Sequence, residues 1–415
     1  MRVAIFSVGT WGDVLPFAGL AASLEAAGHR VTLAVPARFG PRLRALGTRV
    51  HPLPVDLATG WPRRLTNGGT SRALSVTMAY NQLLVRQARP LLESMVEAAR
   101  EADILLLSPA LWIGEHIAEA FRLPSLGVFL QPITPTTEFP PWLLTRHQLA
   151  GRVGRAAAQA LLDAAQGPFR RPVDELRDRL GLPPLRSRTA WVRRMIHEWP
   201  VLHGYSPAVL PAPRDWPAGH RPVGYWWPPT DPGWRPPADL EAFLADGPRP
   251  VYLGFGSMPL ADPDRVSRLV GDALRRTGLR AVVGTGWGGL AVHPGMPPDG
   301  DVLAVGDVPH AWLFERVAAV VHHGGAGTTA AALRAGVPAV TVPFMFDQYL
   351  WADRLARLGA AAPPIPFRSL RADRLAAALL AVVADPGYRR RAEGLSRRLA
   401  EEDGAGAVAT ALAAG

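Results

Sequence analysis

Short apolar runs alternate with helix-like segments along most of the chain. Residues 3–8, apolar except for Ser7, and residues 104–107 show no alternation, which is typical of strands buried on both faces of a parallel sheet. Residues 17–27 have helical spacing, and Gly28 ends this segment before the next apolar run at 31–35. A strand, a helix and a second strand form a βαβ unit, so the pattern predicts an α/β protein with parallel sheets.

Residues 206–238 interrupt this alternation, because proline and tryptophan are abundant there. Such a segment is stiff and extended, and it suits a connector between domains. Strand and helix patterns then resume. We therefore expect two Rossmann-like domains facing across a cleft, at residues 1–205 and 239–385, and helices over 386–415.

Composition limits the classes of function. The chain has 415 residues, of which 48% are hydrophobic and 19% charged, as in a globular protein with large cores. It contains no cysteine, which excludes disulfides, a thiolate metal site and a cysteine nucleophile. The formal net charge is +10, and every basic residue is arginine. These arginines are interleaved with acidic residues and form no basic tract, so we do not expect nucleic-acid binding.

No stretch of the sequence resembles a membrane or export signal. No apolar run reaches the roughly 18–20 residues that a membrane-spanning helix needs. The first residues enter a predicted strand at once and show no signal-peptide pattern. We therefore expect a cytoplasmic protein.

The most informative segment is the sequence HHGGAGTT at residues 322–329. It follows an apolar run at 317–321 and precedes an alanine-rich segment of helical character. A glycine-rich turn from a strand into a helix gathers unpaired backbone N–H groups and the positive end of the helix dipole, where phosphates bind well. Imidazole and hydroxyl groups add further donors. The segment lacks the lysine of a nucleoside-triphosphate loop, so it predicts a different phosphate site; the alternative is a turn without a ligand.

A second candidate lies in the sequence GTWGDVLP at residues 9–16, directly after the first predicted strand. Ligands of open α/β sheets bind at the carboxyl ends of the strands, and Asp13 stands there. Its carboxylate is either a functional base or only the N-cap of the helix that follows. The residues alone leave both interpretations open.

Both segments resemble one family. HHGGAGTT is similar to the diphosphate-binding signature of nucleotide-sugar glycosyltransferases with the GT-B fold. The subgroup it most resembles contains sterol glucosyltransferases and bacterial glycosyltransferases that modify antibiotics. Residues 131–140, 222–226 and 234–240 resemble the same subgroup. The resemblance implies that the last helix returns to the N-terminal domain.

The resemblance also assigns roles to residues. Asp13 is expected to be the catalytic base, His322 to contact a phosphate oxygen, and Asp347 and Gln348 to hold sugar hydroxyls; a helix cap is the alternative for Asp347. The full set of expected donor-binding residues is Ser257, Trp287, Val308, His322, Gly324, Gly325, Gly327, Thr328, Asp347 and Gln348. The expected acceptor-binding residues are Trp11, Thr136, Phe139 and Trp142.

These roles imply an inverting, metal-independent glycosyltransferase without a resident cofactor. It would transfer a hexose or deoxyhexose from a UDP- or dTDP-sugar to a hydroxyl group of a lipophilic acceptor, either an antibiotic aglycone or a sterol-like lipid. One carboxylate base opposite the leaving group implies a single displacement and therefore inversion. The alternatives are a nucleotide-sugar epimerase, a phosphorylase or a non-catalytic nucleotide-sugar binder on the same fold. We expect a monomer or a homodimer.

Three other patterns match motifs without their structural context. Residues 284–289 fit the dinucleotide fingerprint, but prolines follow where its helix should begin. The Asp pairs at 262/264 and 299/301 do not end apolar strands, and the histidines lack zinc-ligand spacing. We therefore expect neither a nicotinamide dinucleotide nor a metal ion. His116, in a predicted helix, is the second candidate for a base.

Overall fold

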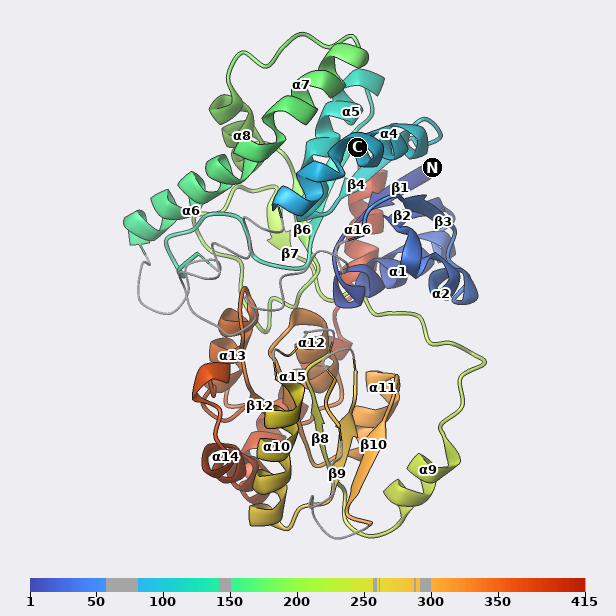
Figure 1. Ribbon diagram of the computed structural model, residues 1–415. Helices are drawn as coiled ribbons and strands as arrows, with labels where there is room; N and C mark the ends of the chain where they lie inside the picture. Colours follow the sequence, from blue (N-terminus) through green and yellow to red (C-terminus); the bar gives the residue numbers. More distant parts are fainter. Residues whose placement is uncertain are drawn as a thin grey trace. The chain divides into compact units, whose positions relative to one another are not determined.

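The computed structural model describes residues 1–56, 81–141, 151–256, 260, 262–286, 289–291 and 300–414. Ser257, Trp287 and Trp142 lie outside these ranges, so the structure does not test their expected roles. The described chain forms two compact units (Figure 1), which are treated separately below. The first contains residues 1–56, 81–141, 151–231 and 402–414, and the second contains the described part of 232–401.

The first unit is built on a parallel sheet of seven strands in the order β3-β2-β1-β4-β5-β6-β7. Every neighbouring pair is parallel. β2 and β3 lie on one side of β1, whereas β4 and the later strands lie on its other side, so the strand order reverses at β1. Ligands of open α/β sheets bind at this point. The strands are β1 (Arg2–Phe6), β2 (Arg30–Pro36), β3 (Val50–Leu53), β4 (Ile104–Leu107), β5 (Ser125–Phe129), β6 (Val201–His203) and β7 (His220–Pro222).

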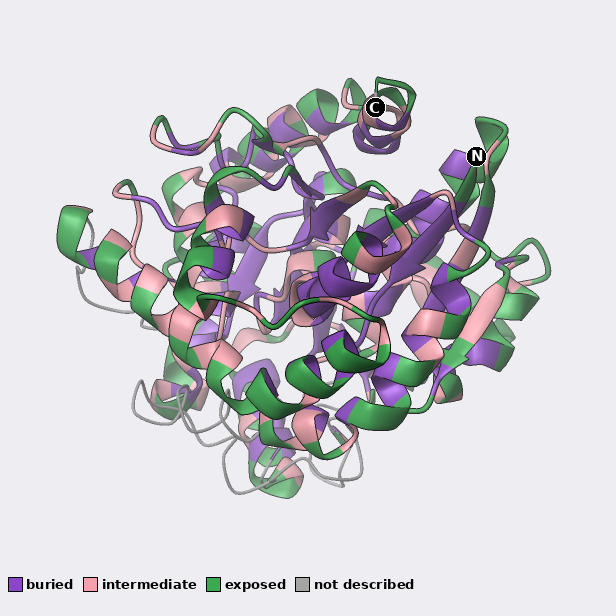
Figure 2. Ribbon diagram, turned by 90° about the horizontal axis from the view of Figure 1, so that it is seen from above, coloured by how far each residue is buried: buried purple, intermediate pink, exposed green. Residues whose placement is uncertain are grey.

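Helices cover both faces of this sheet. Val3 and Ile5 of β1 pack with α1 and α16, whereas Ala4 and Phe6 pack with α4 on the other face. Figure 2 shows buried strands between helices whose outer faces are exposed. The α-helices with described bounds are α1 (Trp11–Ala26), α2 (Gly40–Ala45), α4 (Ala88–Ala99), α5 (Glu115–Phe121), α6 (Gly151–Gln166), α7 (Arg170–Arg179), α8 (Arg188–His197) and α16 (Gly404–Ala413).

The second unit has a five-stranded parallel sheet in the order β10-β9-β8-β11-β12. Its strand order reverses between β8 and β11, so the glycine-rich segment after β11 lies at the expected ligand position. The strands are β8 (Val251–Gly254), β9 (Ala281–Gly284), β10 (Val302–Val305), β11 (Ala319–His322) and β12 (Ala339–Thr341). The α-helices are α9 (Ala238–Ala245), α10 (Pro263–Thr277), α11 (His310–Leu313), α12 (Ala326–Arg334), α13 (Gln348–Arg357), α14 (Ala372–Ala384) and α15 (Pro386–Ala400).

The prediction of two α/β units with parallel sheets is confirmed. Three short strands, β3, β6 and β7, were not expected from the sequence. β3 and β7 are the edges of the sheet. Pro222 is tolerated in β7 because an edge strand does not need every backbone donor. In the described part of the chain, no helix is both long enough and apolar enough to cross a membrane.

The connector is much shorter than the expected range 206–238. The chain passes to the second unit after residue 231. Trp216 and Trp226 are buried within the first unit, because removing large apolar rings from water lowers the free energy. Most of this proline-rich segment is therefore part of the first domain.

The C-terminal helices also divide differently from the expected range 386–415. α15 packs on α12 and stays in the second unit, and only α16 joins the first unit, where it packs on α1. The Trp226 Nε1–H donates to the Gly404 carbonyl oxygen at 3.2 Å, and the Ser206 hydroxyl donates to Glu402 at 2.6 Å. These bonds hold the start of the returning segment.

Candidate active site

Asp13 lies in the first turn of α1, which begins at Trp11 and not at residue 17 as expected. Thr10 is the N-cap, and Asp13 completes a capping box with it. Asp13 Oδ2 accepts hydrogen bonds from the Thr10 backbone N–H (2.8 Å) and from the Thr10 hydroxyl (2.9 Å). Asp13 Oδ1 has no hydrogen bond to a described residue. The cap and the base interpretations are therefore compatible, since they use different oxygens.

Burial raises the pKa of the Asp13 carboxyl above its ordinary value, and the two hydrogen bonds from Thr10 oppose this rise. Gly9 permits the arrangement. Its φ of +145° is unusual for other residues, and a Cβ there would lie 2.5 Å from Asp13 Oδ2. The close approach of Gly9 therefore fixes the carboxylate at the end of β1.

Trp11 was expected to contact the acceptor. Its ring lies 5.5 Å from the Phe39 ring, and the Arg42 guanidinium lies over it at 4.1 Å from the ring centroid. The ring is half-buried, so part of it faces solvent. Its role in acceptor binding stays a prediction.

Thr136 and Phe139 line a pocket between residues 132–141 and α6. The enclosed part of this pocket is small, and most of its empty space is open to solvent. Its lining is mainly apolar: Pro132, Ile133, Thr134, Pro135, Thr136, Phe139, Pro141, Ala158, Leu161 and Leu162. Because this segment follows β5, it shares the carboxyl edge of the sheet with Asp13.

The Thr136 hydroxyl is already bonded within the protein. It donates to Asp215 Oδ1 at 2.5 Å, and the Thr137 N–H donates to the other oxygen at 2.8 Å. Thr136 therefore shapes the pocket, and its hydroxyl proton is not available to a ligand in this arrangement. Sequence reasoning missed Asp215, since no local pattern links residues 79 positions apart.

In the second unit, His322 is the last residue of β11, and its side chain is fully buried at 0% exposure. The Gly324 N–H donates to His322 Nδ1 at 3.1 Å. Burial lowers the pKa of His322 to about 3, so the ring stays neutral. Its Nε2 has no hydrogen-bond partner among the described residues, and the expected contact of His322 with phosphate stays a prediction.

His323 is a second candidate for that contact. It is half-buried, and its ring lies near Gly256 in the loop after β8 and near Gly325 in the loop after β11. A Cβ on Gly325 would lie 2.4 Å from His323 Nε2, and one on Gly256 would lie 3.1 Å from its Cε1. The sequence contained a signal for this residue, because His323 is the first position beyond the strand, where ligands bind.

The glycines of the turn leave the start of α12 accessible. Gly325 is the N-cap of α12, and Gly327 is exposed with open space where a Cβ would be. Thr328 is half-buried in the same first turn. Gly324 has a φ of +84°, and a Cβ there would lie 2.8 Å from the Gln348 carbonyl oxygen. The turn therefore offers backbone N–H groups and packs directly on the segment expected to hold the sugar.

That segment joins β12 to α13. Asp347 is at the N-cap position of α13 but makes no side-chain capping bond, so the cap alternative for Asp347 is wrong. Its Oδ2 instead accepts a hydrogen bond from Trp351 Nε1 at 2.7 Å. Gln348 Oε1 accepts from the backbone N–H groups of Phe344 (2.8 Å) and Met345 (3.1 Å). Val308, expected near the nucleobase, lies after β10 and packs with Phe314 in the core.

Comparison with known proteins identifies this architecture. Residues 3–140 match the glycosyltransferase family 28 N-terminal domain, and residues 294–415 match the C-terminal domain of erythromycin biosynthesis protein CIII-like proteins. The chain is 35% identical to O-mycaminosyltylonolide 6-deoxyallosyltransferase of Streptomyces fradiae, over 97% of this chain and 95% of that protein. The chain belongs to glycosyltransferase family 28.

Two further relatives agree. Sterol 3-beta-glucosyltransferase UGT80B1 of Arabidopsis thaliana is 34% identical over 99% of this glycosyltransferase, which spans 68% of the plant protein. The crystal structure of glycosyltransferase VinC in complex with dTDP has the same fold, with a TM-score of 0.67 and 21% identity over 97% of this chain and 96% of that one.

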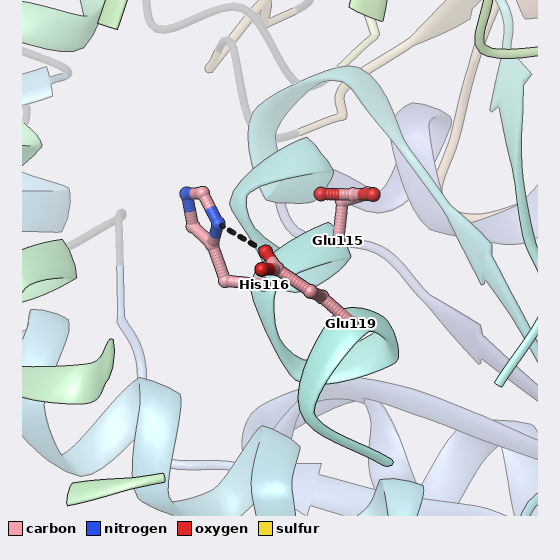
Figure 3. A group of neighbouring side chains, drawn as sticks. All are labelled: Glu115, His116 and Glu119. Carbon is pink, nitrogen blue, oxygen red and sulfur yellow. Dashed lines mark ion pairs between the residues drawn. The ribbon is translucent and has the colours of Figure 1, made fainter. Parts of the chain in front are cut away.

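Glu115, His116 and Glu119 of this glycosyltransferase form another polar cluster on α5 (Figure 3), with ligand atoms within 4.8 Å of one another. Arginines already balance its charge. Arg177 Nη1 donates to His116 Nδ1 (3.0 Å) and to Glu119 (2.7 Å), and Arg194 donates to Glu115 (2.7 Å). Burial, followed by the charge of Arg177, lowers the pKa of His116 to about 4. The cluster is therefore a structural ion network, and it does not suit His116 to act as a base.

Proposed function

We propose that this glycosyltransferase transfers a hexose or deoxyhexose from a UDP- or dTDP-linked donor to a hydroxyl group of a lipophilic acceptor, with inversion at the anomeric carbon. The observation that carries the proposal is a pair of polar sites at the reversal points of two parallel sheets. One is the glycine-rich turn into α12, and the other is the Asp13 carboxylate after β1.

The donor site suits a diphosphate. When the bond from the anomeric carbon to the phosphate oxygen breaks, negative charge accumulates on the leaving group. Backbone N–H groups at the start of α12, with the ring of His323, are in place to donate to it. One such preorganised donor lowers a barrier by roughly 3–4 kcal/mol. These groups give the leaving group its stabilisation without requiring a metal ion.

The acceptor side suits general-base catalysis. As the acceptor oxygen bonds to the anomeric carbon, its proton passes to Asp13 Oδ1 while Thr10 holds Oδ2. The raised pKa of Asp13 makes this carboxylate a stronger base than an exposed one. A hydroxyl that attacks opposite the leaving group, in one step, inverts the configuration.

The apolar pocket beside α6 supports a lipophilic acceptor, because prolines, Leu161 and Phe139 dominate its wall. The names of the relatives point the same way, since one acts on a sterol and the other on a tylonolide. The crystal structure of VinC with bound dTDP supports a dTDP-linked donor, and a UDP-linked donor is the alternative.

A donor and acceptor panel tests this function. The purified protein is incubated with UDP-glucose, dTDP-glucose or dTDP-deoxysugars and with sterols, macrolide aglycones or nitrophenols. Mass spectrometry should detect a glycoside together with an equal amount of released nucleoside diphosphate, and NMR should show an inverted anomeric centre. Isomerised donor without release of nucleoside diphosphate would instead favour an epimerase. Donor binding without any turnover would favour a non-catalytic binder.

A further inference from the structure

The turn that carries Asp347 and Gln348 has a constrained backbone. Phe346 has a φ of +53°, in the left-handed region that residues other than glycine seldom adopt. Such a conformation persists only when surrounding contacts hold it, and it is concentrated at functional sites. The contacts made by this turn therefore identify the side chains that stabilise its backbone conformation.

Trp351 supplies one of these contacts. Its side chain is 1% exposed on the inner face of α13, one helical turn after Asp347. Its Nε1–H donates to Asp347 Oδ2 at 2.7 Å. An indole has a single donor in a fixed direction and no acceptor, so a buried indole holds one carboxylate oxygen in one place.

The other polar side chain of the turn is held in the same way. Gln348 is 5% exposed, and two backbone N–H groups bind its Oε1, which leaves its amide N–H groups to face other partners. The Gln348 carbonyl oxygen also packs against Gly324 of the glycine-rich turn. The sugar-binding turn is thus prepositioned relative to the diphosphate site within the same unit.

We propose that Trp351 is a positioning residue for sugar recognition, because its indole N–H fixes the Asp347 carboxylate without touching the sugar. This inference rests on the proposed function, since it requires a nucleotide-sugar donor. It predicts that the affinity for a free nucleoside diphosphate does not depend on the indole N–H, whereas use of the sugar donor does.

The test compares Trp351→Phe, Asp347→Ala and the double variant. Trp351→Phe should lower kcat/KM for the nucleotide sugar by roughly 10- to 100-fold, as expected when a hydrogen bond to a charged group is lost. The affinity for free UDP or dTDP, measured by calorimetry, should stay unchanged. The double variant should be no worse than Asp347→Ala alone, because both changes remove the same interaction.

Trp312→Phe is the matched control. Trp312 lies on α11 of the same unit, and its indole N–H makes no hydrogen bond to another described residue. Its kcat/KM should stay near that of the wild-type protein. If Trp351→Phe does not fold, 3-benzothienylalanine at position 351 replaces the N–H by sulfur in a ring of nearly the same size.

Three results would overturn the inference while leaving the proposed function intact: an unchanged kcat/KM in Trp351→Phe, an equal loss in free nucleotide affinity, or additive losses in the double variant. A wild-type protein that binds nucleotide but transfers no sugar would overturn the proposed function, and the role of Trp351 with it.

Discussion

Replacing Asp13 by Asn removes the proton acceptor and nearly preserves its shape. The Asn carbonyl oxygen can accept both hydrogen bonds from Thr10, so the capping box at the start of α1 is kept. The loss of negative charge near a helix N-terminus costs about 0.3–1 kcal/mol. A buried charged carboxylate also carries a desolvation cost that the neutral amide does not have, and this offsets part of the loss. The free energy of unfolding should therefore change by less than about 1 kcal/mol.

The effect on catalysis should be much larger. Losing a general base slows turnover by roughly 100- to 10,000-fold. At about 1.36 kcal/mol for each tenfold change, this corresponds to a rise of about 3–5 kcal/mol in the barrier. Because this rise exceeds the change in unfolding free energy several times over, the two effects are separable in one variant.

The assay measures transfer to an aliphatic hydroxyl and to a nitrophenol, with thermal unfolding and calorimetry of the free nucleotide as controls. The nitrophenol reaction should slow much less, because its hydroxyl ionises without help. Nucleotide affinity should not change, since the donor residues belong to the other unit. Because the pKa of Asp13 is raised, wild-type activity should fall on acidification at a pH above the ordinary pKa of an Asp. This decrease in activity at acidic pH should be absent in Asp13→Asn.

Turnover of Asp13→Asn within about tenfold of wild type on the aliphatic acceptor would refute this reasoning, since even the smallest effect of a general base is larger. Asp13 would then be only the N3 residue of the capping box. His116 would not replace it, because its ring is 1% exposed and Arg177 occupies its Nδ1.

The remaining predictions concern the second unit, metal dependence and pH. His323→Ala should weaken calorimetric binding of UDP or dTDP, whereas His322→Asn, which keeps an acceptor for the Gly324 N–H, should bind almost normally; the reverse order would assign the phosphate contact to His322. Asp347→Ala should reduce sugar transfer far more than affinity for the free nucleotide, and equal losses would mark it as structural. A chelator should leave activity intact, and a loss reversed by magnesium or manganese would contradict the metal-free mechanism. The pKa values of about 3 for His322 and about 4 for His323 lie below the ordinary 6.5, so their contribution to stability is complete above about pH 6.5 and is lost as the pH falls toward the folded values. Thermal unfolding should therefore occur at a lower temperature at pH 5 than at pH 7.5, and an equal or higher temperature at pH 5 would contradict this.

The α/β architecture was predictable because a strand covered by helices on both faces must be apolar at every position. For that reason β4 was found at Ile104–Leu107 with its observed bounds. The two candidate loops were predictable for a related reason, since glycine, aspartate and histidine directly after such strands are not needed by the core. Local chemistry alone therefore indicated Asp13 and the segment 322–329.

The tertiary structure decided how far each side chain in those loops is buried. The sequence contains two adjacent histidines, and only the end of β11 shows that His322 is buried and His323 is the outer one. Likewise, only the fold brings Asp215 to Thr136 and Arg177 to His116, across 79 and 61 positions of the chain. The sequence determines which groups are present and which local backbone they prefer. Packing between distant segments determines which of their atoms are already bonded, because each buried donor or acceptor takes the partner that the fold brings within reach.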